Sequence, residues 1–511
     1  MPALALALDD LNLQEFITMA LEALQRLDQQ KGDLPSQSYV PRTMPQALGM
    51  FDMMMIFMMI MLFINNPVST IGAGPAAFTY WLLGAVVFFI PCVIGVAQLG
   101  VLYPHEGSTY VWTHRALGNF WGFFASLIFW MPGLLAMVAS LSIGIAFIQG
   151  LNSSWLTQPW QQGLLCIALL IISTVLALQP MSTLRLVINT ITLLTYAVVV
   201  LLGGAALIWL ATGHRPATPF NDLHSWGIDP SNFVLYGSVV LAYLGADVSM
   251  ILGGEMASER IASRHVSWGA FFVILSYLVI TFALLVVLGP AAASQGPFAV
   301  ISVIDQVFGK FLGNVAAVCV IAYFPIFTTL LNVAFARLLM VASIDRFLPL
   351  GLSRLNRNRQ PANAIVFQTV VACLCAALIF LLPYLLPLGQ PTDLATVVFT
   401  VTLSVLTLVW AFSSIFIFVD LAVFYFRQRE RFLRLLVVPL PVLWLCIIIA
   451  PLACLMAMIV TLLYSPIPQQ ISNGQWWYIV GGLTMICLVV CGIASMFAIS
   501  QAAWQDQSFE A

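Results

Sequence analysis

The sequence predicts an all-α integral membrane protein, and three observations lead to that fold class. Of the 511 residues, 61% are hydrophobic and only 7% are charged, whereas a soluble domain carries about 25% charged residues. Apolar stretches of about 20 residues, the length of a membrane-spanning helix, follow one another along most of the chain. Lys and Arg gather in alternate loops between these stretches, which is the pattern of a multi-pass protein.

Twelve stretches are long and apolar enough to be membrane-spanning helices. The predicted spans lie near residues 47–73, 76–100, 117–149, 162–179, 184–211, 231–254, 266–289, 311–343, 362–386, 394–426, 434–463 and 475–500. Residues 290–310 are polar and interrupted by Pro and Gly, so we expect short helices across the outer face instead of a span.

The distribution of basic residues predicts the orientation. If the N-terminus is cytoplasmic, twelve spans place only Arg215 and Lys310 at the outer face and every other Lys and Arg at the inner face. Basic residues are enriched in cytoplasmic loops, so we expect both termini in the cytoplasm. Residues 501–511 then form a short cytoplasmic tail.

The first 46 residues form a polar cytoplasmic segment with an acidic amphipathic helix. One interpretation is a tail that is mobile or loosely docked; the other is a helix that docks on the basic inner loops and modulates opening. The segment MPALALALDD has no basic region before its apolar residues, so we expect no cleavable signal peptide.

Several function classes find no support in the sequence. Nine cysteines are scattered without a C-x-x-C pair and the five histidines lie in or beside polar loops, so we expect no metal site and no cofactor. The formal net charge of -2 indicates no nucleic-acid partner. No G-x-x-x-x-G-K-[ST] phosphate loop and no H-E-x-x-H pair occurs, so we expect neither a nucleotide-driven pump nor an enzyme.

The first predicted span is interrupted at mid-membrane depth. Pro67 removes a backbone donor and follows Asn65 and Asn66, and Ser69 and Thr70 come next. Polar, non-helical backbone at that depth is tolerated only where it lines a cavity or is packed in protein. A simple proline kink is the alternative.

The sixth predicted span has a matching interruption, with Gly245, the embedded Asp247, and Gly253 and Gly254 before Glu255. Interrupted helices at matching positions of two halves point to an inverted-repeat transporter. The sequence therefore predicts a first repeat over 47–211, a second over 231–426 and two further helices over 434–500.

Three segments resemble the amino acid–polyamine–organocation (APC) superfamily. They are GVAQLGVLYPHEGSTYVWTHRALGNFWGFF, LAYLGADVSMILGGEMASERIASR and NVAFARLLMVASIDRFLPLGLSRLNRNRQPANAI. The glutamate:GABA antiporter-like branch is nearest, with its proline-containing first break and the pair Glu255–Met256. The resemblance implies a LeuT-type fold of five plus five helices and two more. It further implies secondary active transport of amino acids or related amines across the cell membrane by alternating access.

Three departures from the family pattern bear on how the substrate is bound, on its size and charge, and on proton coupling. A Gly-Ser-Gly type of break binds the substrate carboxylate in many members, but residues 65–70 read NNPVST here. The tryptophan that arginine exchangers carry in helix six is replaced by Leu241, which removes the stacking platform for a large cation. The lysine that several proton-coupled members carry in helix five is absent.

The predicted substrate-binding residues lie at the two breaks: Asn65, Asn66, Pro67, Val68, Ser69, Thr70, Leu241, Tyr243 and Gly245. Small polar residues at such places also serve as interhelical hydrogen-bonding groups, which is the alternative. Asp247 is predicted to bind the coupling proton, because a carboxyl group in the membrane is costly and by default functional. A structural carboxylate that caps the broken helix is the other interpretation.

Two further groups complete the predictions. Thr328 and Thr329 are candidates for an oxygen cage around Na⁺, with ordinary helix packing as the alternative. Charged residues near the inner mouth are predicted to form a cytoplasmic gate: Glu255, Arg260, Arg264, Arg337, Asp345 and Arg346. Asp420 has no assigned role. A Na⁺-coupled symporter and a transport-dead sensor or subunit remain the competing functions to a proton-coupled transporter or exchanger.

Overall fold

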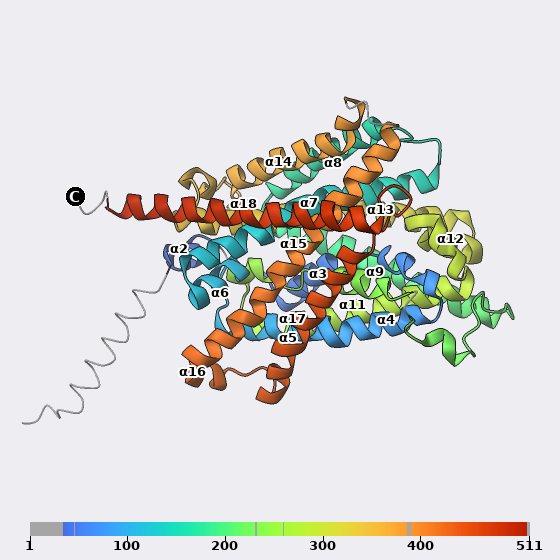
Figure 1. Cartoon of the computed structure of the whole chain (residues 1–511), viewed down its shortest axis with the longest axis horizontal. Helices are drawn as coiled ribbons and strands as arrows, with labels where there is room; N and C mark the ends of the chain where they lie inside the picture. The colour runs from blue at the N-terminus through green and yellow to red at the C-terminus, as the bar shows by residue number, and fades with distance from the viewer. Residues whose placement is uncertain (1–33, 45, 230–231, 259, 386–389, 508–511) are drawn as a thin grey trace, which may run out of the picture.

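A computed structural model describes residues 34–507 except 45, 230–231, 259 and 386–389. The described chain is helical throughout, apart from one isolated bridge between Leu48 and Met256. Long helices run across the width of the molecule and shorter ones cover its two ends (Figure 1). Helix α2 and the last turns of α18 lie at the same end of the molecule in this view.

The α-helices are α2 (Pro35–Thr43), α3 (Met50–Met61), α4 (Ala76–Gly84), α5 (Ile90–Leu102), α6 (Ser108–Leu117), α7 (Asn119–Leu151), α8 (Pro159–Ala177), α9 (Met181–Ala211), α10 (Val234–Ala242), α11 (Arg260–Val287), α12 (Ala299–Phe308), α13 (Lys310–Ile344), α14 (Ala362–Phe380), α15 (Pro391–Arg427), α16 (Arg429–Arg434), α17 (Leu440–Leu463) and α18 (Asn473–Gln507). The short helices are η1 (Asn66–Ser69), η2 (Ile71–Ala73), η3 (Ala85–Phe89, a π-helical turn), η4 (Leu223–Trp226), η5 (Val248–Glu255), η6 (Pro290–Phe298), η7 (Leu350–Ser353) and η8 (Leu382–Tyr384).

Eleven helical stretches of the described chain are long and apolar enough to cross a membrane. They correspond to all predicted spans except the sixth. The sixth stretch is not among them because it divides into α10 and η5, each too short to span alone. The interruption that the sequence predicts at this position therefore accounts for the difference.

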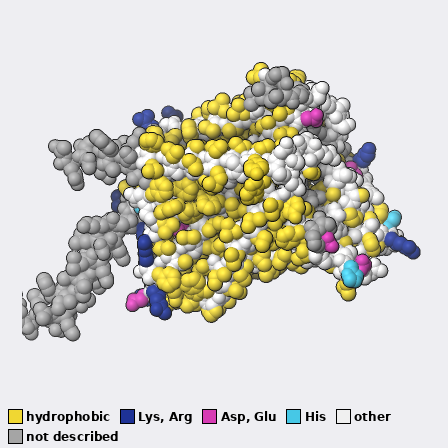
Figure 2. All heavy atoms as spheres, in the orientation of Figure 1, with side chains coloured by type: hydrophobic (Ala, Val, Ile, Leu, Met, Phe, Trp, Pro, Cys, Tyr) yellow, Lys and Arg dark blue, Asp and Glu magenta, His cyan; other side chains and the backbone are white. Residues whose placement is uncertain are grey.

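The surface between the two ends is apolar, as a lipid-facing surface must be. Figure 2 shows hydrophobic side chains covering the middle of the molecule, with charged side chains at its ends. Large apolar residues are exposed along the outward faces of α9 and α18, including Val200 at 74% and Phe497 at 68%. No soluble protein would leave so many of them in water.

Helix α13 runs through the interior, and almost every side chain from Tyr323 to Ser343 is buried. Glycines allow neighbouring helices to approach it: a Cβ atom on Gly133 of α7 would lie 2.1 Å from the ring of Phe335. Residues 290–308 form η6 and α12, which confirms the short helices expected there. The predicted acidic amphipathic helix lies within residues 1–33, outside the described residues.

Candidate functional site

The first predicted break is present. Helix α3 ends at Met61, Leu62 to Asn65 are not helical, and a 3-10 turn begins at Asn66 with Pro67 inside it. Leu62 has extended dihedral angles (φ -97°, ψ 99°). The chain thus changes direction in the middle of a stretch that is otherwise apolar, where backbone groups without partners are costly.

Two tyrosines from other helices bind the backbone groups that this break frees. The hydroxyl of Tyr323 on α13 lies 2.6 Å from Met59 O and 2.8 Å from Leu62 O. The hydroxyl of Tyr277 on α11 donates to Met61 O at 2.6 Å and accepts from the Phe63 N–H at 3.3 Å. The unwound segment is therefore held by side chains of the second predicted repeat.

The second break follows α10, which ends at Ala242. Gly245 adopts φ +102°, a conformation that glycine tolerates far better than other residues. The 3-10 helix η5 begins directly after Asp247 and bends again at Leu252. Both predicted interruptions therefore exist. The first contains Pro67, which cannot donate a backbone hydrogen bond, and the second contains Gly245 at a positive φ.

The two breaks are in contact. A Cβ atom on Gly245 would lie 3.7 Å from Ile60 Cγ2 and 3.3 Å from Trp410 Cζ2 of α15. Toward the inner end, Leu48 N–H donates to Glu255 O and Ala257 N–H donates to Leu48 O, both at 3.0 Å. Helix α3 is thereby fastened to η5 on the cytoplasmic side of the breaks.

Two buried polar atoms near the breaks have no hydrogen-bond partner in the part of the chain that is described. One is the acceptor Asn65 Oδ1 in the first break and the other is the donor Trp410 Nε1 beside Gly245. Phe129 and Phe335 surround the indole ring, at 6.2 and 6.5 Å between ring centroids. The first break therefore offers an unpaired acceptor, and the second break has an unpaired donor with an aromatic wall beside it.

The other predicted substrate residues of the first break have internal partners. Ser69 Oγ donates to Asn66 O at 2.7 Å, and Thr70 Oγ1 donates to Pro67 O at 2.9 Å. Asn66 Nδ2 donates to the Tyr277 hydroxyl at 3.2 Å. Pro67 and the following Val68 are buried.

The predicted wall residues of the second break lie on different sides. Tyr243 stacks on Phe89 at 4.5 Å between centroids and donates to Trp81 O at 3.4 Å, so its ring faces the second span. Leu241 is half-buried. Of the nine predicted substrate residues, Asn65 carries a buried acceptor without a partner among the described residues, and Gly245 lies against Trp410.

Asp247 is buried, with only 2% of its surface exposed. Thr109 Oγ1 of α6 donates to its Oδ2 at 2.9 Å. It forms no ion pair with any described residue, and its side chain does not cap η5. The carboxyl group is thus isolated from counter-charge at the point where the second break ends.

Thr328 and Thr329 are directed toward α7 and α8. Thr328 Oγ1 lies 3.0 Å from Ser140 Oγ, and Thr329 Oγ1 donates to Pro325 O at 2.8 Å. The carbonyls of Met59 and Leu62 that a cation at the first break needs are already bonded to Tyr323. The sodium cage stays a prediction.

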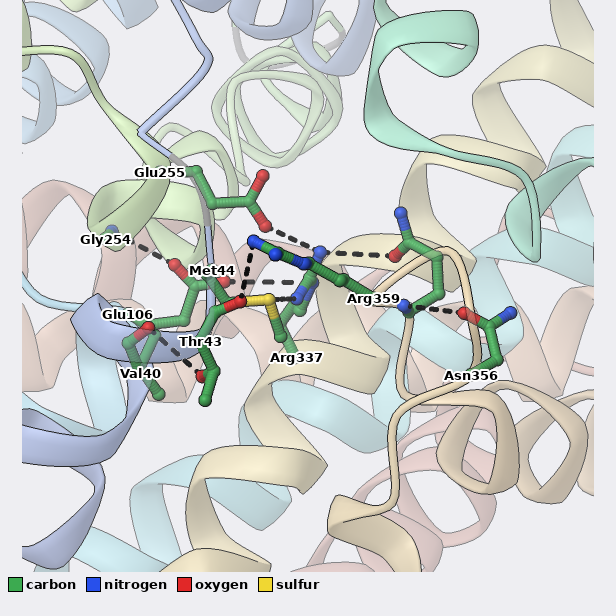
Figure 3. A network of polar contacts seen from close by, with 10 residues as sticks. Val40, Thr43, Met44, Glu106, Gly254, Glu255, Arg337, Asn356 and Arg359 are labelled. Atoms are coloured by element: carbon green, nitrogen blue, oxygen red, sulfur yellow. Dashed lines mark hydrogen bonds and ion pairs between the residues drawn. The ribbon is translucent and has the colours of Figure 1, made fainter.

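The strongest charged cluster lies beside Met44, at the end of the molecule where α2 lies. Arg337 Nη2 lies 2.6 Å from Glu255 Oε1, and Arg337 Nε lies 3.9 Å from Glu106 Oε1. Gly254 N–H donates to Glu106 Oε2 at 3.0 Å, and Figure 3 shows both carboxylates directed toward the guanidinium group. Burial, followed by the charge of Glu255, raises the pKa of Glu106 well above its ordinary value.

The other predicted gate residues lie apart from this cluster. Asp345 accepts from Ser36 N–H and Ser36 Oγ, both at 2.8 Å, and from the Tyr110 hydroxyl at 3.0 Å. Arg260 and Arg264 are exposed on α11. Arg346 has φ +67°, a left-handed conformation that non-glycine residues rarely adopt.

Three important residues escaped the sequence analysis. Glu106 stands in the PHEG motif, whose acid was visible but was not assigned to the gate. Tyr323 and Trp410 lie in apolar runs where nothing in the local pattern separates them from packing residues. Among described residues no group of three or more His, Cys, Asp or Glu side chains could hold a metal ion.

Two broken helices, a buried carboxyl group beside the second break and a charged cluster at the end of the molecule where α2 lies are the features of a multi-pass membrane protein with a LeuT-type fold. The structure of MhsT, solved in complex with L-phenylalanine, has the same fold, with a TM-score of 0.58 at 14% identity over 82% of this chain and 99% of that chain.

The profile of the amino acid permease family matches residues 48–491, so the chain belongs to that family, as the resemblance to the APC superfamily predicted. The inner membrane transporter YjeM of Escherichia coli is 24% identical over 46% of this chain and 49% of its own length. The branched-chain amino acid permease BcaP of Lactococcus lactis is 24% identical over 60% of this chain and 69% of its own. The relatives are transporters, and the chain is a multi-pass inner or plasma membrane protein and not an enzyme. Its assignment to the glutamate:GABA antiporter-like branch stays a prediction.

Proposed function

We propose that this chain transports a small amino acid or its decarboxylated amine by alternating access, driven by protons or by exchange. The two interrupted helices carry the proposal, because each break has beside it a buried polar atom with no hydrogen-bond partner among the described residues: Asn65 Oδ1 in the first break and Trp410 Nε1 beside Gly245 of the second. A zwitterion supplies both missing partners: its ammonium group donates to the amide oxygen and its carboxylate accepts from the indole N–H.

The surroundings favour a neutral, apolar side chain on the substrate. Phe129, Phe335 and Trp410 form aromatic walls, and Leu241 replaces an aromatic platform for a cation. Asp247 follows Gly245 by two residues and carries the carboxyl group that is closest in sequence to the second break. We assign it to proton binding. The names of BcaP and of the MhsT complex support branched-chain amino acids and phenylalanine as the first substrates to try.

The experiment is uptake of radiolabelled leucine, phenylalanine, glutamate and γ-aminobutyrate into proteoliposomes that contain only this chain. A thermal-shift screen with the same compounds selects the candidates, because a ligand stabilises the state that it binds. Uptake above that of empty liposomes supports transport. Specific stabilisation by a ligand without uptake, or without exchange from preloaded liposomes, favours the sensor or subunit instead.

The proton assignment is tested with Asp247→Asn. The variant keeps the size of the side chain and its hydrogen bond from Thr109, but it cannot titrate. We expect normal folding and uptake with a flatter pH dependence than that of the parent chain. Uptake by Asp247→Asn with the pH dependence of the parent chain would remove Asp247 from the coupling step.

Na⁺-coupled symport is the second candidate, favoured by Thr328 and Thr329 on α13. Met59 O and Leu62 O each accept from Tyr323, and each carbonyl keeps a second lone pair with which it can bind a cation. Replacement of Na⁺ by choline in the uptake buffer distinguishes Na⁺-coupled symport from transport that is driven by protons or by exchange. A loss of uptake identifies the symporter.

A further inference from the structure

A single short helix binds three buried carboxyl groups from three different spans. On α6, Thr109 donates to Asp247 of the second break, and Tyr110 donates to Asp345 at the end of α13. One turn beyond Thr109, Thr113 Oγ1 donates to Asp420 Oδ2 of α15 at 2.7 Å. Residues four apart lie on the same face of a helix. Asp247 and Asp420 are therefore bound by neighbouring hydroxyls on one face of α6.

Asp420 is the less satisfied of the two carboxyl groups within the membrane. Its side chain is fully buried, and Oδ1 has no hydrogen-bond partner among the described residues. A Cβ atom on Gly95 of α5 would lie 3.0 Å from Ile417 Cγ2 and 3.3 Å from Leu421 Cδ1, so α5 packs tightly on this part of α15. One hydrogen bond does not replace the hydration of a carboxylate.

The cations nearest in sequence have other partners. Arg427 Nη1, two turns beyond Asp420, donates to Ala116 O at 2.7 Å. Arg431 Nη2 donates to Leu102 O at 2.9 Å, and Arg115 Nη2 is bonded to Gln37 Oε1. Asp420 forms no ion pair in the described part of the chain.

The remaining titratable groups on the helices that pack against α15 do not supply a counter-charge to Asp420 either. Helix α7 carries none, and α6 adds His114, which lies beside Phe347 and Tyr110. The buried and half-buried titratable groups of the neighbouring helices are thiols: Cys92 on α5, Cys446 and Cys454 on α17, and Cys487 and Cys491 on α18. A thiol cannot balance the charge of a carboxylate, whereas a proton can.

We propose that Asp420 is a second proton-binding site of the transport cycle, held by Thr113 and joined through α6 to Asp247. This inference rests on the proposed function and extends it. Asp420 takes up one proton as a carboxylate and releases it from the carboxylic acid, and no other bond changes. Thr113 is a positioning residue, because it acts only through the carboxyl group to which it donates.

Helix α6 is suited to join the two sites because its N-terminal end is also tied to η5. Gly107 N–H donates to Ile251 O at 3.0 Å, and Glu106 accepts from Gly254 N–H. A displacement of η5 during the cycle therefore pulls on α6 and changes the bond between Thr113 and Asp420. The affinity of Asp420 for its proton then depends on the conformation of the second break.

Infrared spectroscopy of the purified full chain in lipid tests proton binding without any substrate. A protonated carboxylic acid has a C=O stretch that a carboxylate lacks. We expect a C=O band that titrates with pH in the parent chain, loses one component in Asp420→Asn, and keeps that component in Asp247→Asn. An unchanged spectrum of Asp420→Asn over the whole titration would overturn the proposal.

Thr113→Val provides a second variant that leaves the carboxyl group in place. Loss of the one donor to the charged form moves the pH at which the Asp420 band disappears by about one pH unit or more toward higher pH. Thr192→Val is the matched control, since Thr192 is also buried but donates to Ile188 O of its own helix. Equal titrations in Thr113→Val and in the control would contradict the role of Thr113.

Uptake measurements decide whether the proton belongs to transport. We expect Asp420→Asn to flatten the pH dependence of uptake while exchange at constant pH continues. If the infrared component is lost but uptake keeps the pH profile of the parent chain, Asp420 is a structural acid and the proposal fails. A chain that transports nothing while the band titrates would refute the proposed function alone, because the band is measured without substrate.

Discussion

Arg337 Nη2 lies 2.6 Å from Glu255 Oε1, and neither side chain is more than 1% exposed. The guanidinium group also lies 3.9 Å from Glu106, so one cation faces two carboxylates. Removal of one partner from a buried ion pair leaves an uncompensated charge. The cluster joins η5, α13 and the loop before α6, which are the elements that must separate if the inner side opens.

Arg337→Met tests this cluster. We expect the free energy of unfolding to fall by about 3–5 kcal/mol, because the buried carboxylate of Glu255 then lacks its counter-charge. A thermal melt in detergent measures the loss. Arg264→Met, on an exposed arginine of α11, is the control and leaves the melting temperature nearly unchanged. Adding Glu255→Gln to Arg337→Met returns part of the stability, and a double variant that melts no higher than the single one contradicts the account.

The first break depends on a hydroxyl group of another helix. Tyr323→Phe leaves Met59 O and Leu62 O without their donor, and an unsatisfied buried carbonyl costs about 1–3 kcal/mol. We expect a lower melting temperature and slower uptake. Tyr478→Phe removes a hydroxyl from a side chain that is 78% exposed, so it serves as the control. A Tyr323→Phe variant with the stability and uptake rate of the control would exclude this role.

Gly245 is required both by its backbone conformation and by its neighbours. At φ +102° a Cβ atom is strained by about 1–2 kcal/mol, and here it would also lie 3.3 Å from the Trp410 ring. We expect Gly245→Ala to reduce uptake at least about tenfold, because a factor of ten corresponds to about 1.4 kcal/mol.

Gly204→Ala is the matched control for Gly245→Ala. Gly204 lies in α9 with no atom within 4 Å of an added Cβ, so alanine there fits and improves helix propensity. Uptake by Gly204→Ala should equal that of the parent chain. If both variants transport equally well, the second break does not need glycine at this position.

The two breaks could be predicted from the sequence because their causes are local. Pro67 cannot donate, Gly245 permits an unusual φ, and Asp247 is a rare residue inside a span. Tyr323 and Trp410 could not be predicted, because their roles depend on how α13 and α15 are rotated toward the breaks. In a lipid-embedded chain the surface is as apolar as the interior, so hydrophobic periodicity does not reveal that rotation.

The charged cluster of Arg337, Glu255 and Glu106 could be predicted only in part for a similar reason, and its role as a gate stays a prediction. The net charge of a loop is visible in the sequence, but which charges are buried depends on long-range packing. Arg337 and Glu255 form an ion pair although they are 82 positions apart in the sequence. Asp345 instead meets Ser36 of α2, a contact between residues 309 positions apart. No local sequence pattern predicts either pairing.

The buried Asp345 makes the stability of the folded chain dependent on pH. Burial raises the pKa of Asp345 from 3.8 to about 6, although hydrogen bonds from Ser36 and Tyr110 lower it in part. A raised pKa means that the folded chain holds the proton more tightly than the unfolded chain does. The stability from that proton is complete below about pH 3.8 and is lost as pH rises through about 6.

Melting curves of the parent chain and of Asp345→Asn, recorded from about pH 4 to about pH 7, measure this effect. We expect the parent chain to lose up to about 3 kcal/mol relative to the variant as pH rises through that window, since each pH unit of difference is worth about 1.4 kcal/mol. Ser36→Ala, which removes the Oγ donor but leaves the N–H, is expected to enlarge the loss, because the charged form is then less well bonded. Parallel curves for all three chains would show that Asp345 does not titrate in this range.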